Sequence, residues 1–188
     1  MKKGLAATIL VLTFALTCVA QEVCKRHTQP EGGFSYCPPD GWRIEEQTGE
    51  KHKMLFGTPS NGFAPNINIK EGESAAPLAD YVAAAITYIL ANTEKIGATS
   101  IKVVGQSDFV TASEQRGMRV VFQSVFKSFL IRTIQYYSNG KDGKKIVVTC
   151  TALESDKEVL DAVFDRSMKT FQMDSVNPPS SMKPSELR

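Results

Sequence analysis

The sequence contains few of the side chains that usually carry catalysis. Only two histidines, His27 and His52, occur in 188 residues, and a serine or thiol nucleophile needs a base within hydrogen-bond reach. The patterns G-x-S-x-G, C-x-x-C and H-E-x-x-H are absent, and so is a glycine-rich phosphate-binding loop. We therefore expect no catalytic residue and no cofactor.

The sequence also lacks a large excess of either charge. It has 22 Lys and Arg residues against 20 Asp and Glu residues, without a long basic run. Proteins that bind nucleic acid depend on such basic surface for much of their affinity. We therefore expect no nucleic-acid partner.

The segment Met1–Ala20 has the layout of a secretory signal peptide. Lys2 and Lys3 precede the apolar run Leu5–Leu16, and Cys18-Val19-Ala20 ends the segment with small residues at the first and third places. The apolar run is too short for a membrane span. We expect cleavage between Ala20 and Gln21, which removes two lysines, balances the charges and leaves an exported protein, periplasmic or extracellular, with no membrane span.

Cys18 lies where a bacterial lipoprotein carries its lipidated cysteine. The lipoprotein signal usually has Leu three residues before this cysteine and Gly or Ala directly before it. Ala15 and Thr17 occupy those positions here. Cleavage after Ala20 is therefore favoured over lipid anchoring.

Three cysteines remain after cleavage, namely Cys24, Cys37 and Cys150. An exported protein meets an oxidising compartment, where disulfides form. Cys24 and Cys37 are close in sequence, whereas Cys150 lies in an apolar run that predicts a core strand, so we expect a Cys24–Cys37 disulfide and a free, buried Cys150. One alternative is three free thiols, and another is a metal site in which His27 joins Cys24 and Cys37. We favour a disulfide beside an exposed histidine and therefore assign no metal ligand.

Hydrophobic periodicity predicts strands, a helix, more strands and a second helix. The fold class expected is α+β, a mostly antiparallel sheet packed between helices as a layered α/β/α sandwich. Residues 21–33 are predicted to be an irregular lead-in, 34–173 a single domain and 174–188 a disordered tail. The expected strands are Phe34–Cys37, Lys53–Phe56, Asn66–Lys70, Ile101–Thr111, Gly117–Val125, Phe129–Ser138 and Lys145–Thr151, and the expected helices are Pro77–Asn92 and one opened by a Ser155/Glu158 capping box that runs to about Phe171.

Two groups of polar residues are candidates for binding. Acidic clusters at Glu45-Glu46, Glu50 and Glu71-Gly72-Glu73 are interpreted as solvated charge, with weak calcium binding as the alternative. Asn66 and Asn68 share one face of a predicted strand and could line a ligand cleft, although hydrogen bonding within the sheet is the favoured interpretation.

Several segments, in order and spacing, resemble the PsbP-like family. Phe34–Trp42 is similar to its opening strand and "YPxGW" turn, and Pro65–Ile69 and Leu78–Val82 resemble the second strand and the start of the first helix of its bacterial members. Lys144–Thr151, Ala152–Asp156 and Met168–Phe171 resemble the closing strand and the last helix. The sequence departs from the family pattern at Cys37, where a small residue is common, and by an extra proline before the PDGW turn.

The family includes extrinsic proteins of the oxygen-evolving photosystem, small exported bacterial proteins of unknown role and a nuclear-import factor that binds a small GTPase. The N-terminal segments characteristic of photosystem members are absent. The resemblance implies an exported, non-enzymatic binding or accessory module of an envelope or membrane-associated assembly, whose partner the sequence does not identify.

Two alternatives remain open at this point. One is a periplasmic protein that binds a small ligand or a metal, using a cleft between the Pro77–Asn92 helix and the sheet; a deep polar pocket would favour it. The other is a hydrolase with an unrecognised site. We expect no cleft that holds two or more buried, adjacent titratable groups with shifted pKa values, and a hydrogen bond from His52 to an acid inside such a cleft would favour the enzyme.

Overall fold

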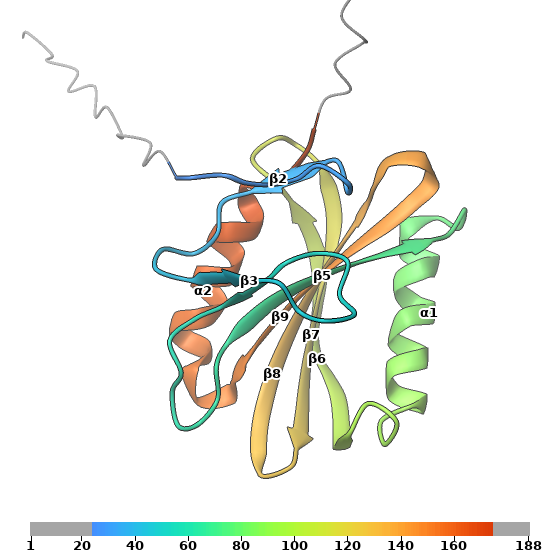
Figure 1. The fold of residues 1–188 in the computed structure, drawn as a ribbon. Coiled ribbons are helices and arrows are strands. Elements are labelled where there is room, and N and C mark those ends of the chain that lie inside the picture. Colours follow the sequence, from blue (N-terminus) through green and yellow to red (C-terminus); the bar gives the residue numbers. More distant parts are fainter. Residues whose placement is uncertain (1–23, 175–188) are drawn as a thin grey trace, which may run out of the picture.

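The computed structural model describes residues 24–174 (Figure 1). The predicted signal peptide, its cleavage point, Cys18 and almost all of the predicted tail lie outside the described residues. The elements in chain order are β1 (His27–Gln29), β2 (Phe34–Tyr36), β3 (Arg43–Glu45), β4 (Met54–Phe56), β5 (Asn66–Glu73), α1 (Leu78–Ala91), β6 (Ala98–Val110), β7 (Arg116–Phe126), β8 (Phe129–Asn139), β9 (Lys144–Leu153), α2 (Lys157–Lys169) and β10 (Gln172–Met173), with short 3₁₀ turns at Lys141–Gly143 and Glu154–Asp156.

Seven strands form one antiparallel sheet in the order β3-β4-β5-β9-β8-β7-β6. α1 covers one face of this sheet and α2 the other, so that the sheet lies between the two helices in Figure 1. The structure thus confirms the α+β class and the layered α/β/α arrangement. Among residues 24–174, no helix has both the length and the apolar character needed to cross a membrane.

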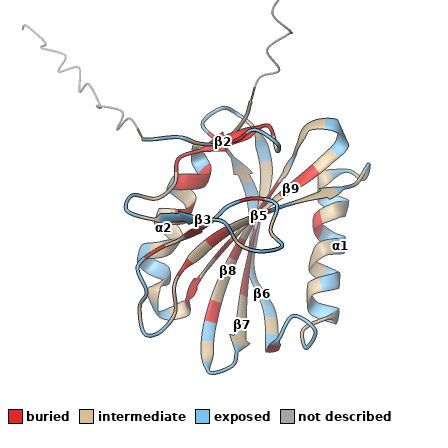
Figure 2. Ribbon diagram, viewed as in Figure 1, coloured by how far each residue is buried: buried red, intermediate tan, exposed pale blue. Residues whose placement is uncertain are grey.

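Alternation along the strands divides the core between the two faces. On β7, Val120 and Phe122 belong to the same core cluster as Val82 of α1, whereas Val121 belongs to the cluster that contains Phe164 of α2. Figure 2 shows buried residues along the strands between the two helices. Side chains on a strand point alternately to opposite faces. A sheet covered by a helix on each face therefore needs apolar residues at successive positions, which is the pattern of β7.

A second, three-stranded sheet, in the order β1-β2-β10, lies at one end of the molecule. The sequence analysis predicted only β2 of these strands. It interpreted residues 21–33 as irregular, but β1 lies within this range and pairs with β2, from His27 opposite Tyr36 to Gln29 opposite Phe34. Asp174, assigned to the tail, is also held, because its backbone N–H donates to the carbonyl of Gly33 (2.8 Å).

The predicted capping box at the start of α2 does not form. The helix begins at Lys157, its N-cap residue is Asp156, and no side chain caps its N-terminus. Ser155 lies instead in the preceding 3₁₀ turn, and its hydroxyl bonds to Asp156 Oδ1 (3.0 Å). The turn moves the helix start past the serine, so Glu158 no longer occupies the third helical position that a capping box requires.

Candidate functional site

A cleft of about 440 Å³ lies between α1 and the sheet. This volume is within the usual range for small-ligand sites, about 300–1,000 Å³. The other cavity of note, about 20 Å³, has room for little more than a water molecule. Fourteen residues line the larger cleft, and none is charged: Phe63, Asn66, Ile89, Ile96, Ala98, Ile101, Phe122, Ser124, Phe126, Ile131, Thr133, Gln135, Thr149 and Thr151.

The polar side of the cleft is built by strand register. Asn66 of β5 is paired with Thr151 of β9, which is paired in turn with Thr133 of β8. Two residues along, Thr149 of β9 is opposite Gln135 of β8. Because paired residues of neighbouring strands point to the same face, these five polar side chains form two adjacent rows across three strands.

A hydrogen-bond chain orients part of this polar side. The Tyr137 hydroxyl donates to Gln135 Oε1, and Gln135 Nε2 donates to Thr149 Oγ1 (3.3 Å). Burial raises the pKa of Tyr137 well above its usual value, so its hydroxyl stays a donor. Thr149 accepts a hydrogen bond and keeps its own hydroxyl proton free to donate into the cleft.

Other polar groups of the cleft have hydrogen-bonding atoms that no protein group uses. Asn66 Nδ2 donates to the carbonyl of Ala64 (3.2 Å), which leaves its Oδ1 as a free acceptor. Within residues 24–174, the hydroxyls of Thr133 and Thr151 form no hydrogen bond with another protein group. Neutral donors and acceptors without protein partners therefore line one side of the cleft.

The opposite side is apolar. Ile89 comes from α1, Ile101 from β6 and Phe122 from β7. At the rim, Ile96 is 46% exposed and Phe126 is 38% exposed. The cleft is therefore divided, with most hydroxyl and amide groups over β5, β9 and β8 and most hydrocarbon over α1, β6 and β7; Ser124 of β7 and Ile131 of β8 are the exceptions.

Gly97 brings the rim of the cleft together. Its φ of 85° lies in the left-handed region that favours glycine, and a Cβ there would lie 2.9 Å from Phe126 Cε2. The loop between α1 and β6 can therefore turn tightly against the Phe126 ring. A larger residue at this position is expected to displace the loop and open the cleft.

The Glu71 carboxylate is largely buried and pairs with three basic side chains. Its interpretation as solvated charge was therefore wrong. Its side chain is 8% exposed, and its carboxylate accepts from Lys51 Nζ (2.9 Å), Lys144 Nζ (3.1 Å) and His52 Nε2 (2.7 Å). Burial alone would raise the pKa of Glu71, but these three donors outweigh burial and lower its pKa to about 2. The other acidic clusters pair with exposed cations, Glu45 with Arg43, Glu46 with Lys53 and Glu50 with Lys70.

His52 bonds to an acid, Glu71, which the sequence analysis named as a sign of an enzyme if the pair lay inside a cleft. His52 is 3% exposed, and since a carboxylate only accepts, Nε2 carries the shared proton while Nδ1 has no partner. The pair does not line either cavity described above. It anchors the loop before β4 to β5, and a carboxylate held by three donors with a pKa of about 2 is a poor general base.

A second group of ion pairs attaches α2 to the sheet. Arg132 of β8 binds Asp161 through Nε (2.8 Å) and Nη2 (2.7 Å), and Arg119 of β7 binds Asp165 through Nε (2.9 Å). Burial raises the pKa of Tyr136 well above its usual value, so its hydroxyl stays protonated and donates to Asp165. Arginine on the sheet and aspartate on the helix thus hold the two layers in register.

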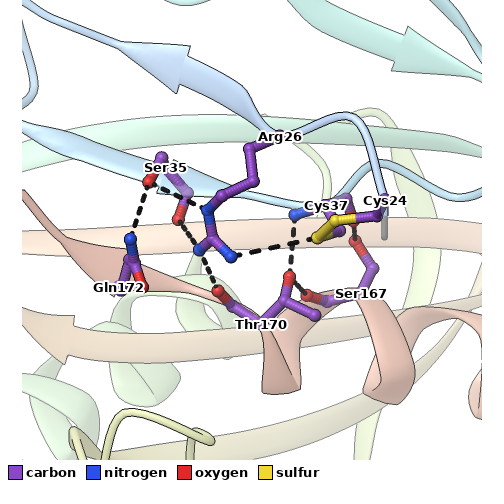
Figure 3. Close-up of a disulfide and its surroundings, with 7 residues drawn as sticks. All are labelled: Cys24, Arg26, Ser35, Cys37, Ser167, Thr170 and Gln172. Atoms are coloured by element: carbon purple, nitrogen blue, oxygen red, sulfur yellow. Dashed lines mark hydrogen bonds between the residues drawn. A yellow bond between two sulfur atoms is a disulfide. The ribbon is translucent and has the colours of Figure 1, made fainter. Parts of the chain in front are cut away.

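The structure joins Cys24 to Cys37 by a disulfide, as predicted, with the Cα atoms 5.8 Å apart (Figure 3). Around it, Cys37 N–H donates to Thr170 Oγ1 (2.7 Å) and Ser167 Oγ donates to the Cys37 carbonyl (2.5 Å). Arg26 Nη2 donates to the Thr170 carbonyl (2.5 Å). The disulfide therefore secures the N-terminal segment against the C-terminal end of α2, where a cation also complements the helix dipole.

Cys150 and His27 are the remaining residues that the sequence analysis considered for a site. Cys150 is free and fully buried, and burial raises the pKa of its thiol well above the usual value. His27 is half-buried and contacts Gln29 Nε2 (2.8 Å). Within the described part of the chain, no group of three or more His, Cys, Asp or Glu side chains is arranged to hold a metal ion.

Sequence reasoning found one part of the cleft and missed the rest. It placed Asn66 on a face that could line a cleft but favoured hydrogen bonding within the sheet; the structure shows both a local hydrogen bond and a position in the cleft. Asn68 is not among the lining residues. Thr133, Thr149 and Thr151 gave no signal of their own, because threonine is common in strands. The alternation of Thr149 and Thr151 with the apolar residues Val148 and Cys150 was the available clue.

The chain matches no protein-family profile, and no curated protein matches it in sequence. Its fold, however, is the PsbP-like fold, as the sequence resemblance implies. The solution structure of cyanobacterial PsbP (CyanoP) from Synechocystis is similar with a TM-score of 0.61 at 13% identity, over 84% of this chain and 97% of that one.

Two further solved structures are similar. The Ran-binding protein Mog1p of Saccharomyces cerevisiae has a TM-score of 0.57 at 10% identity, over 79% of this chain and 94% of that one. LpqN of Mycobacterium tuberculosis, described as involved in cell envelope biogenesis, has a TM-score of 0.50 at 12% identity, over 74% of this chain and 82% of that one. At such identities the similarity shows the fold alone.

Proposed function

We propose that this protein is an exported, non-enzymatic binding module that serves an envelope or membrane-associated assembly, and that the cleft beside α1 is its binding site. The observation that carries the proposal is a ligand-sized cleft lined by fourteen residues, none of them charged. Acid–base and nucleophilic catalysis need positioned titratable groups. A cleft without them is suited to binding rather than to turnover.

The surface beside the cleft supports an accessory role. α1 carries a single charged residue, Asp80, and Tyr88 on this helix is 64% exposed. The rim residues Ile96 and Phe126 are exposed as well, so apolar side chains of α1 and of the cleft rim are available to a partner. The similar structures include a Ran-binding protein and a protein involved in cell envelope biogenesis, which supports a role in recognition.

Export is supported by the disulfide, because disulfides persist in oxidising compartments. We propose that residues 1–20 are the signal peptide, that cleavage releases Gln21 as the new N-terminus, and that residues 34–173 form one domain. Mass spectrometry of the native protein should find a mature chain that begins at Gln21. A chain beginning at a lipidated Cys18 would contradict the proposal of a released protein.

The role of the cleft can be tested by filling it. Thr133→Phe puts a ring among the lining residues, and Thr28→Phe, on an exposed position of β1, is the matched control. Both proteins are compared with the wild type for folding and for the molecules that co-purify from the envelope fraction. Molecules lost with Thr133→Phe and retained with Thr28→Phe support binding in the cleft; identical co-purification for all three proteins would exclude the cleft as the binding site.

A further inference from the structure

The absence of charge in the cleft restricts what it can hold. A charged group taken from water needs an opposite charge or several hydrogen bonds to compensate its lost hydration. No charged side chain lines the cleft, although Lys127 lies near its mouth, with Nζ 5.7 Å from the centroid of the Phe126 ring. An ionised head group inside the cleft would therefore have no opposite charge among the lining residues, whereas a neutral head group needs none.

The polar side of the cleft specifies what a neutral ligand offers. Thr149 presents a free hydroxyl proton because its oxygen already accepts from Gln135, and Asn66 presents a free Oδ1 because its amide nitrogen already donates to Ala64. Thr151 is opposite Asn66 and two residues from Thr149 on β9, and Thr133 is opposite Thr151 on β8. These groups match a hydroxyl or an N–H amide, which both donates and accepts hydrogen bonds, and an ester, whose oxygens accept them.

The apolar side specifies the rest of the ligand. Ile89, Ile101 and Phe122 offer a continuous hydrocarbon wall, and the exposed rim residues Ile96 and Phe126 extend it to the mouth. Covering these side chains removes apolar surface from water, which is the main favourable contribution to such binding. Branched aliphatic side chains outnumber aromatic ones on this wall, so an aliphatic body fits it better than a flat ring.

We propose that the cleft binds an uncharged amphiphile, with its aliphatic body against α1, β6 and β7 and its hydroxyl or ester head against Asn66, Thr133, Thr149 and Thr151. This inference rests on the proposed function, because it names the ligand class of the same cleft. It distinguishes a neutral lipid-like molecule from a fatty acid, a phosphate ester or an organic cation.

Three probes of equal chain length test the charge requirement: 1-lauroylglycerol, laurate and dodecyltrimethylammonium, each below its critical micelle concentration. Binding to the mature, disulfide-bonded protein is measured by calorimetry and located by NMR shifts of the cleft residues. The glycerol ester should bind, and each ion should bind at least about tenfold more weakly, because the lining leaves its charge unpaired. Equal binding of the three probes would overturn the assignment.

Removal of single hydroxyls tests the role of the polar side. Thr133→Val and Thr149→Val keep the side-chain shape, and each should weaken binding of 1-lauroylglycerol by about three- to tenfold, the usual effect of one lost hydrogen bond. Thr28→Val, on exposed β1, is the control and should leave binding unchanged. Unchanged affinity in both cleft variants would overturn the placement of the head group.

The outcomes separate this inference from the proposed function. If all three probes bind equally and Thr133→Phe abolishes their binding, the cleft is a binding site but its selectivity for uncharged ligands is wrong. If no probe binds, the amphiphile assignment is overturned, and the proposed function is then decided by co-purification with Thr133→Phe. Binding that survives Thr133→Phe would contradict the cleft as the site.

Discussion

Replacing Glu71 by glutamine should destabilise the protein and change its response to acid. The Glu71 carboxylate accepts from Lys51, His52 and Lys144. These donors lower its pKa from an ordinary value of 4.5 to about 2. Each tenfold change in proton affinity is worth about 1.4 kcal/mol, so this difference corresponds to at most about 3 kcal/mol of stability at neutral pH. Since Lys51 is half-exposed, solvent reduces its share of this value.

The direction of the pH effect follows from the lowered pKa. A carboxylate whose pKa is lower in the folded chain than in the unfolded chain stabilises the fold fully above the unfolded pKa of about 4.5, and this contribution is lost as the pH falls toward the folded pKa. The wild type should therefore lose stability between pH 4.5 and about 2. Glu71→Gln should lack this part of the decline, because glutamine does not titrate.

Urea unfolding of both proteins at pH 7, 5, 4 and 3 measures these differences. Glu50→Gln is the control, because Glu50 pairs with Lys70 at the surface (3.2 Å) and such pairs contribute about 0–1 kcal/mol. The free energy of unfolding should fall by up to about 3 kcal/mol for Glu71→Gln at pH 7, with a shrinking gap to the wild type at lower pH. Equal stability at pH 7, or a constant gap across the series, would refute the role assigned to Glu71.

Three further outcomes are expected from unfolding and labelling experiments. Asp161→Ala leaves Arg132 without its bidentate partner and should lower the free energy of unfolding by about 2 kcal/mol. Glu158→Ala, on the exposed side of α2, is the control and should change it by less than about 0.5 kcal/mol. Similar values for the two variants would contradict the role of these ion pairs in holding α2 to the sheet. Cys37→Ser removes the disulfide and should cost about 3 kcal/mol in chemical denaturation, on the chain-entropy account of a loop of this size; an unchanged unfolding midpoint would count against it. Cys150 should react with a thiol reagent only after unfolding, because it is fully buried, and fast reaction in the native protein would disprove its burial.

Local pattern was sufficient to predict the main layers of the fold. On β7, Met118, Val120 and Phe122 recur at every second residue, as on one face of a strand, and Leu78, Val82, Ala85 and Ile89 have the spacing of a helix face. Their periods differ, so each element type could be predicted from its own residues. Their positions along the chain predicted the order strands, helix, strands, helix, which the structure confirms, and the resemblance implied the PsbP-like fold.

Short local patterns were not sufficient to predict the smaller elements or the exact start of α2. β10 has two residues, and it exists because Gln172 and Met173 can pair with Ser35 and Phe34 of β2. No local pattern specifies a two-residue strand, since its stability comes from the partner. The capping box failed for the opposite reason, because a plausible local motif at Ser155 was replaced by a 3₁₀ turn leading from β9 into α2.

The sequence by itself determined the type of each long element, the choice of Cys24 and Cys37 for the disulfide and the scarcity of catalytic side chains. Only the tertiary structure decided that Glu71 is buried, because its three donors come from the loop before β4 and from the start of β9. It also decided where the cleft lies. Asn66, Thr151 and Thr133 are far apart along the chain, and only the register of β5, β9 and β8 brings them side by side, since hydrogen-bonded pairing aligns residues that no local preference relates.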